Sequence, residues 1–141
     1  MNKRFVWSMA LLLSLCLLVF SSCRDEKDSL PAKPVVNLTE VGRGNNKTGV
    51  AGADLHLEGH ISADGIIRRI DIEIHLESGG GFSIEKSYTE GKYIEVKNTD
   101  FHEHIDIPAE APAGDYHLHF SVTDRSGQTT TTVSELSVVA E

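Results

Sequence analysis

The sequence predicts an all-β fold: an immunoglobulin-like β-sandwich of about seven antiparallel strands that follows a lipoprotein signal peptide. From Val35 onward, apolar residues alternate with polar ones, which is the period of strands with one buried face. No window of ten or more residues in this part of the chain has a convincing helical period. Short turns rich in Gly, Pro, Asn and Asp separate the candidate strands, as expected of a sandwich.

The N-terminal segment predicts export and lipid anchoring. Residues 1–22 begin with two basic residues, continue through an apolar run from Met9 to Phe20 and end in two serines before Cys23. The run is shorter than the roughly 20 residues of a membrane span, so it is typical of a secretory signal peptide. The small residues before Cys23 resemble a lipobox, in which that cysteine is acylated and becomes the first mature residue. A plain secretory cleavage site is the alternative.

Residues 23–33 are expected to form an acidic tether between the lipid and the domain, because they are too few and too polar to fold alone. Their charged RDEKDS stretch resembles the export tag of some Gram-negative surface lipoproteins. We therefore expect a lipid-anchored outer-membrane protein exposed at the cell surface, with the periplasmic face as the alternative. Cys16 lies within the signal, so the single mature thiol of Cys23 is left without an intramolecular partner.

The charge of the chain argues against nucleic acid as a partner. Loss of Lys3 and Arg4 with the signal reduces the 13 basic residues to 11 against 21 acidic ones, a formal charge of −10. Such a surface repels phosphate backbones and attracts cations. The mature chain of about 119 residues fits one domain, which we expect over residues 34–141.

The alternation predicts the strands in chain order. Residues 54–62 place Leu55 and Leu57 on one face, and residues 67–76 place Ile70, Ile72 and Ile74 on one face. The candidate strands cover residues 35–41, 54–62, 67–76, about 82–88, 101–107, 116–122 and about 129–139, with a further short strand near 93–96.

Two details of the later strands carry expectations of their own. Glu103 breaks the apolar pattern of residues 101–107, so that strand is expected to become buried only near Ile105. Gly114 permits a turn, and Tyr116 lies where a tyrosine corner would tie the preceding loop to the sandwich. The stretch TDRSGQ then predicts the hairpin into the last strand.

The sequence does not predict an enzyme. The loop GRGNNKTG at residues 42–49 faintly resembles a phosphate-binding loop, but Asn46 stands where glycine is needed and no helix follows. No serine or threonine lies in a nucleophile elbow, and no spacing singles out a pair of catalytic carboxylates.

The histidines form the most informative pattern. Residues i and i+2 of a strand share a face, so two imidazoles at that spacing can converge on one ion. In an immunoglobulin-like topology strand B pairs with E and strand C with F, and E and F belong to opposite sheets. The sequence thus predicts two groups on opposite outer faces. One group contains His56, Glu58, His60, His102 and His104, and the other contains Asp71, Glu73, His75, His117 and His119.

The second group is the preferred metal site. His75 ends strand C at the edge where strand F begins, so it is expected beside His117 or His119. Three imidazoles with Glu73 or a water as the fourth ligand suit a zinc or copper ion. The alternative cluster consists of His56, His60, His102 and His104, and simple solvated strand faces would explain the histidines equally well.

Several stretches together resemble a known family. They are the lipoprotein signal, IDIEIH ending in His75, HEHIDIPAEAPAGDYH with His102, His104 and His117, and TDRSGQ. The chain resembles an uncharacterised family of His-rich, immunoglobulin-like bacterial lipoproteins known as domain of unknown function 4625. The resemblance implies a lipid anchor and a sandwich, but no activity.

The sequence leaves three functional hypotheses. The first is a surface lipoprotein that binds a transition metal and passes it to an outer-membrane transporter or another surface protein. The second is a non-catalytic adhesion or glycan-associated module, which needs exposed aromatic residues in its loops; the candidates are Phe82, Tyr88 and Tyr93. The third is a pH-responsive interaction surface, because clustered imidazoles titrate near neutrality.

Overall fold

The structure is a computed structural model that describes residues 29–140. The predicted signal peptide of residues 1–22, the lipidation site Cys23 and the tether up to residue 28 lie outside the described residues. Within the described range, no helix has the length and apolar character needed to cross a membrane.

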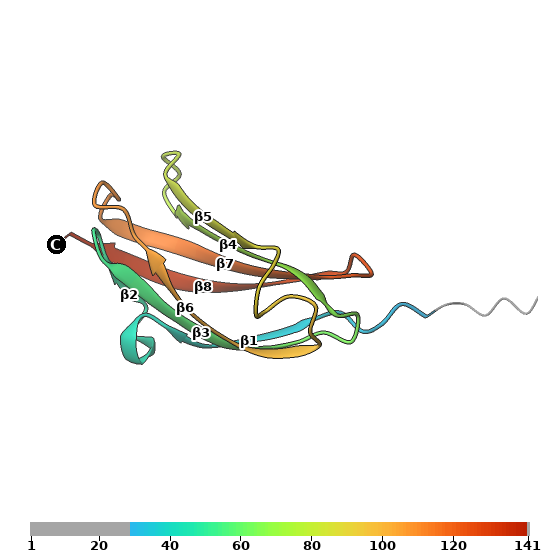
Figure 1. Cartoon of the computed structure of the whole chain (residues 1–141). Coiled ribbons are helices and arrows are strands. Elements are labelled where there is room, and N and C mark those ends of the chain that lie inside the picture. Colours follow the sequence, from blue (N-terminus) through green and yellow to red (C-terminus); the bar gives the residue numbers. More distant parts are fainter. Residues whose placement is uncertain (1–28, 141) are drawn as a thin grey trace, which may run out of the picture.

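Strands of residues 29–140 form two sheets that pack face to face (Figure 1). The three-stranded sheet has the order β1 (Val35–Val41), β3 (Asp54–Ser62) and β6 (Asn98–Asp106). The five-stranded sheet has the order β2 (Thr48–Val50), β8 (Thr129–Val139), β7 (Gly114–Asp124), β4 (Ile67–Leu76) and β5 (Ser83–Tyr88). A short 3-10 turn, Arg43–Asn45, lies between β1 and β2. The predicted all-β sandwich is confirmed.

The strand pairing places the two histidine groups on opposite faces of the molecule. β3 pairs with β6 and β4 pairs with β7, both antiparallel, as the predicted B–E and C–F pairings require. β6 and β7 therefore belong to different sheets. The short β2 was not predicted; it joins the edge of the larger sheet by pairing in parallel with β8.

Aromatic residues form the centre of the core. Phe101 of β6 meets Phe120 of β7 edge to face, with ring centroids 5.0 Å apart, so the two sheets touch through these rings. Tyr116 is fully buried, and its hydroxyl donates a 2.7 Å hydrogen bond to the Pro112 carbonyl. This contact is the predicted tyrosine corner, and burial raises the pKa of the Tyr116 phenol. Within residues 29–140, the buried apolar side chains run from Val41 to Val138 and form one core cluster between the sheets.

The predicted strand near residues 93–96 is absent from the described structure. Tyr93 and Ile94 are consecutive and both buried, whereas neighbouring side chains of a strand in a two-sheet sandwich point in turn to the core and to the outer face. The amide of Ile94 bonds to the Gly91 carbonyl in a turn, and Glu95 has a positive φ of 66°. The segment is a loop that inserts Tyr93 between the sheets.

The expectation that β6 becomes buried only near Ile105 is wrong. Phe101, four residues earlier, is already 1% exposed. Glu103 lies on the inner side between these two residues, where the Tyr93 hydroxyl and Lys92 contact its carboxylate at 2.7 and 3.2 Å. Burial alone would raise the pKa of Glu103, but the contacts with Tyr93 and Lys92 outweigh it and lower that pKa. A partnered carboxylate is therefore accommodated beside the core.

Candidate metal centre

Three imidazoles gather on the outer face of the three-stranded sheet. His56 of β3 lies directly opposite His104 of β6, and Glu58 lies opposite His102. The His56 ring is 4.9 Å from that of His102 and 5.1 Å from that of His104, measured between centroids. The rings of His102 and His104 are 5.7 Å apart. We call these three residues the β3–β6 triad.

The triad can converge on one ion with little movement. One ring nitrogen from each histidine lies within 4.8 Å of one from each of the others. Ligands 2.0 to 2.1 Å from a tetrahedral zinc ion are separated by about 3.4 Å. The nitrogens need to approach one another by no more than about 1.4 Å, which side-chain torsions can supply without moving the strands.

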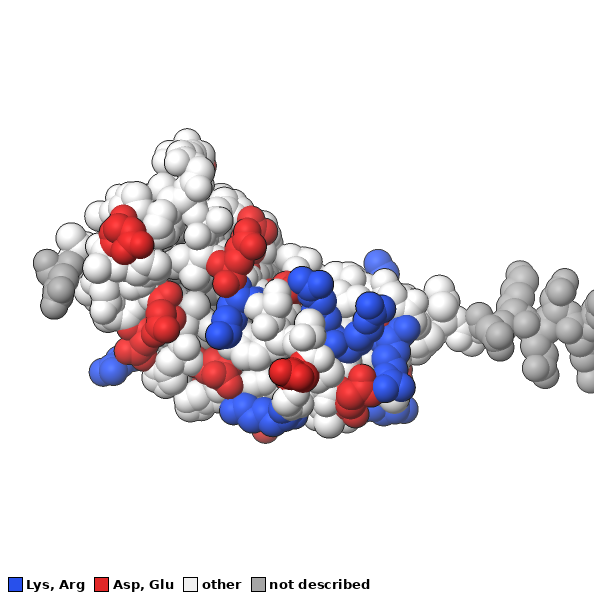
Figure 2. Space-filling model, turned by 45° about the horizontal axis from the view of Figure 1, so that its top comes forward, with Lys and Arg blue, Asp and Glu red and all other residues white. Residues whose placement is uncertain are grey.

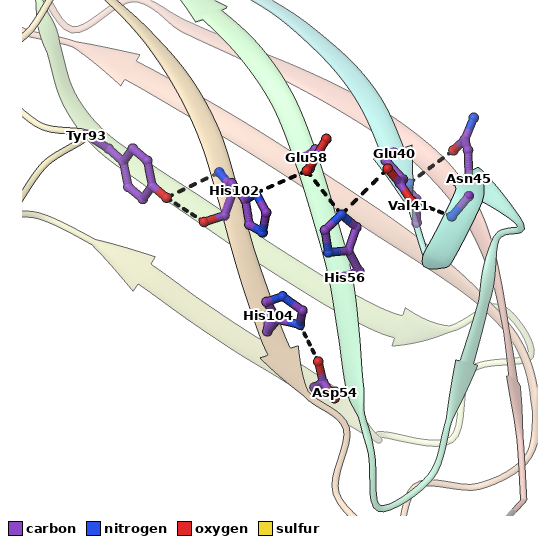
Figure 3. Close-up of polar contacts among 10 residues, drawn as sticks. Glu40, Val41, Asn45, Asp54, His56, Glu58, Tyr93, His102 and His104 are labelled. Carbon is purple, nitrogen blue, oxygen red and sulfur yellow. Dashed lines mark hydrogen bonds and ion pairs between the residues drawn. The ribbon is translucent and has the colours of Figure 1, made fainter.

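A carboxylate lies against one ring nitrogen of every histidine in the triad (Figure 3). Asp54 contacts Nδ1 of His104, and Glu58 lies 3.0 Å from Nδ1 of His102. Glu58 also lies 3.2 Å from Nε2 of His56. These contacts leave Nε2 of His102 and His104 and Nδ1 of His56 for a metal. Ligating histidines in metal sites almost always donate the second ring N–H to a carboxylate, a backbone carbonyl or a water, which fixes the tautomer and the ring orientation.

The carboxylates also set the charge of the site. The hydrogen bond from His104 lowers the pKa of the Asp54 carboxyl, so Asp54 remains ionised at neutral pH. The His56 side chain is 16% exposed, against 56% for His102 and 48% for His104. The site is therefore anchored at His56 and opens to solvent on the β6 side.

A bulge in β1 brings a further carboxylate to the site. The pairing of β1 with β3 shifts by one residue between Leu38 and Glu40, so that Glu40 lies opposite Glu58 on the outer face instead of turning inward. One Glu40 oxygen lies 3.6 Å from Nε2 of His56, and the other accepts a hydrogen bond from the Gly44 amide. Glu40, His56 and Glu58 thus form a second group of ligand atoms within 4.8 Å of one another.

The backbone of β6 is held in place beneath the triad. The Tyr93 hydroxyl lies 2.7 Å from the His102 carbonyl oxygen and accepts a 3.2 Å hydrogen bond from the His102 amide. Figure 3 shows this ring beside β6, on the side of the strand away from β3. Because both peptide groups of His102 are fixed, the position of its imidazole is restricted as well.

His60, which the alternative cluster included, does not join the triad. It lies opposite Asp100 in the β3–β6 register, and its Nδ1 is 2.5 Å from an Asp100 carboxylate oxygen. Its side chain is 65% exposed. His60 therefore forms a separate surface pair.

The preferred residues of the sequence prediction share the outer face of the five-stranded sheet. His75 lies opposite His117, and Glu73 lies opposite His119. The rings of His75 and His119 are stacked 4.9 Å apart at 20°, and His117 is 5.8 Å from His75. Because the two stacked rings lie in nearly parallel planes, their nitrogens do not point toward one common position. Within residues 29–140 the ligand atoms of these three histidines do not form a group within 4.8 Å, and His117 instead groups with Glu77 and Glu135.

Sequence reasoning missed two carboxylates that lie beside the β3–β6 triad. Glu40 could not be found because strict alternation from Val36 and Leu38 turns it inward, and the bulge that reverses its direction leaves no local signal. Asp54 did carry a signal, since it lies two residues before His56 and therefore shares the face of that histidine.

The family comparison covers nearly the whole chain. The model described as "Domain of unknown function (DUF4625)" matches residues 21–139. The chain belongs to this family. No curated protein matches this DUF4625 chain significantly.

Solved structures share the sandwich of this DUF4625 protein. Wild-type OgpA from Akkermansia muciniphila has a TM-score of 0.51 at 14% sequence identity. The match covers 74% of this chain and 28% of the OgpA chain. A DUF4466 family protein from Parabacteroides merdae has a TM-score of 0.52 at 11% identity, over 74% of this chain and 45% of its own. CopC from Methylosinus trichosporium OB3b has a TM-score of 0.44 at 16% sequence identity. The match covers 76% of this chain and 96% of CopC. The chain spans less than half of the length of OgpA and of the DUF4466 protein, and its likeness to these two proteins concerns the fold alone. The likeness to CopC supports no conclusion about this chain.

Proposed function

We propose that this protein is a non-catalytic metal-binding domain that takes up a divalent transition-metal ion, zinc or copper, through His56, His102 and His104. The observation that carries the proposal is that ring nitrogens of the three imidazoles lie within 4.8 Å of one another, while each imidazole also has a carboxylate against one ring nitrogen. Three imidazoles with a water or a glutamate oxygen as the fourth ligand suit either ion.

The proposed setting is the outer membrane, with the domain anchored through acylated Cys23. The signal-like residues 1–22 and the acidic tether support this placement. A tethered domain with an open site can exchange its ion with an outer-membrane transporter or another surface protein. The acidic surface favours capture of cations from solution.

The aromatic residues do not favour an adhesion module. Tyr93 is 3% exposed and contacts β6, so it offers no platform for a sugar ring. Phe82 and Tyr88 are partly buried and pack against the core. Burial raises the pKa of Tyr88 to about 12, as expected for a phenol withdrawn from water.

A calorimetric titration tests the proposal. The chelator-stripped soluble chain from residue 24 onward is titrated with Zn²⁺ and with Cu²⁺ at neutral pH. We expect one tight equivalent with a dissociation constant below about 1 µM, and a loss of at least about 100-fold in a His56→Ala, His104→Ala double variant.

The control is His60→Ala, which removes an exposed histidine of the same face but outside the triad. It should bind as tightly as the unmodified chain. Binding no tighter than about 1 mM, or an equal loss in the control, would contradict the proposal, because the triad would then have no special affinity.

A further inference from the structure

The outer face of the five-stranded sheet carries a second set of ligating side chains. His75, His117 and Glu135 lie side by side on β4, β7 and β8, each directly opposite the next. Nε2 of His117 is 3.6 Å from a Glu135 carboxylate oxygen. Glu77, just beyond the end of β4, is held there by the hydrogen bond from its amide to the Asp115 carbonyl.

This face carries negative charge that lacks basic partners. Glu73 of β4 lies opposite Glu85 of β5, and like charges at such positions repel each other. Among the described residues, Glu73 and Glu135 form ion pairs only with histidines, and Glu77 and Glu85 form none. These carboxylates give the face a negative potential that attracts cations.

The three imidazoles of this face differ in their surroundings. Nδ1 of His75 is a buried atom without a hydrogen-bond partner in residues 29–140, and its ring is stacked on that of His119. His117 stands across from this stack, with its ring nearly perpendicular to that of His119. Ligand atoms of His117, Glu77 and Glu135 all lie within 4.8 Å of one another. His117 is therefore the histidine of this face that can share an ion with carboxylates.

We propose that His117, Glu77 and Glu135 form a second cation site, distinct from the β3–β6 triad. One imidazole and two carboxylates make a harder ligand set than three imidazoles, so the site takes oxygen-preferring divalent ions such as Mn²⁺. It lies on the opposite outer face of the sandwich, because β7 and β8 belong to the other sheet. The protein would thus bind two ions of different character at once.

Paramagnetic broadening by Mn²⁺ tests the second site. The amide NMR spectrum of the soluble chain from residue 24 is recorded while MnCl₂ is added at substoichiometric amounts. We expect the signals nearest Glu77, His117 and Glu135 to broaden first. A Glu77→Gln, Glu135→Gln double variant should need at least about tenfold more Mn²⁺ for the same broadening. Both side chains are exposed, and unchanged core signals will show that the variant is folded.

Two control variants make the result specific. Glu85→Gln removes a carboxylate of the same sheet outside the site and should leave the Mn²⁺ response unchanged. The His56→Ala, His104→Ala variant should also retain the Mn²⁺ response. Binding at the second site is therefore tested independently of the triad. Broadening spread evenly over acidic surface residues, broadening centred on β3 and β6, or an unchanged response in the Glu77→Gln, Glu135→Gln variant would overturn the proposal.

Discussion

At the scale of single residues, the carboxylates behind the triad decide how well it is preorganised. Asp54 contacts Nδ1 of His104, so Nε2 of the ring is the nitrogen that would face a bound ion. Asp54 is the first residue of β3, and its backbone is paired with Asp106 of β6. The carboxylate is therefore held by the sheet and does not depend on a mobile loop.

Substituting Asp54→Asn should weaken zinc binding about 10–100-fold, the effect usual for the loss of such an orienting carboxylate. The shape of the side chain is kept, but the negative charge that favours the Nδ1–H tautomer is lost. Calorimetric titration with Zn²⁺ measures the change. Asp106→Asn is the matched control, because it removes an exposed carboxylate from the paired position and should have no effect. Equal affinities of Asp54→Asn and the unmodified chain would show that Asp54 does not orient His104.

The sequence alone could group the histidines but could not rank the groups. The i, i+2 spacing and the expected pairing of strands correctly assembled His56 with His102 and His104, and His75 with His117 and His119. Whether rings converge or stack depends on side-chain torsions, which alternation does not encode. The triad converges, whereas His75 stacks on His119.

At the scale of elements, the turn after β1 holds Glu40 at the site. Gly42 has φ 71°, and its amide bonds to the His56 carbonyl across the sheet. A Cβ added there would lie 2.3 Å from the Asn46 side chain and 2.8 Å from the Thr48 carbonyl oxygen. The turn thus depends on glycine for two reasons, its left-handed backbone and the close packing around it.

Gly42→Ala should lower the free energy of unfolding by about 2–4 kcal/mol, since both backbone strain and overpacking oppose the substitution. Gly44→Ala is the comparison, because Gly44 also has a positive φ of 63° but no atom within 4 Å of an added Cβ. It should lower that free energy by only about 1 kcal/mol. Urea denaturation measures both values. Equal losses would show that the packing around Gly42 contributes nothing.

Most strands were predictable, and the failures have physical causes. The strands at residues 35–41, 54–62, 67–76 and 129–139 have the predicted bounds. Residues 54–62 and 67–76 have one clearly apolar face, whereas the Thr-rich strand at 129–139 is buried only toward its end, at Leu136 and Val138. The three residues of β2 are too short for a periodic signal and become a strand only through pairing with β8. Tyr93 was misassigned because a loop residue that enters the core resembles a strand residue in the sequence.

At the scale of the whole molecule, the candidate metal ligands lie toward one end of the sandwich. The triad is near the start of β3, whose first residue Asp54 follows the turn after β2, and His75 and His117 are near the end of β4 and the start of β7. The described chain begins at the opposite end, where Pro31 accepts a hydrogen bond from Gln128. Figure 1 shows this N-terminal segment leaving the sandwich away from the C-terminus.

On one face of the molecule, charge follows the same axis. On the face shown in Figure 2, basic residues concentrate toward the end where the described chain begins, and acidic residues predominate toward the other end. A domain held by its N-terminal side would therefore present its acidic, histidine-bearing end outward. Such a field raises the local concentration of cations near the proposed sites.

The most direct test of the central claim is anomalous diffraction at the zinc edge from crystals of the zinc-loaded protein. We expect a strong peak 2.0 to 2.1 Å from one ring nitrogen of each of His56, His102 and His104. That result would establish the triad as a metal centre. A zinc-loaded crystal in which no peak lies among these three imidazoles, while the rings keep their contacts with Asp54 and Glu58, would contradict it.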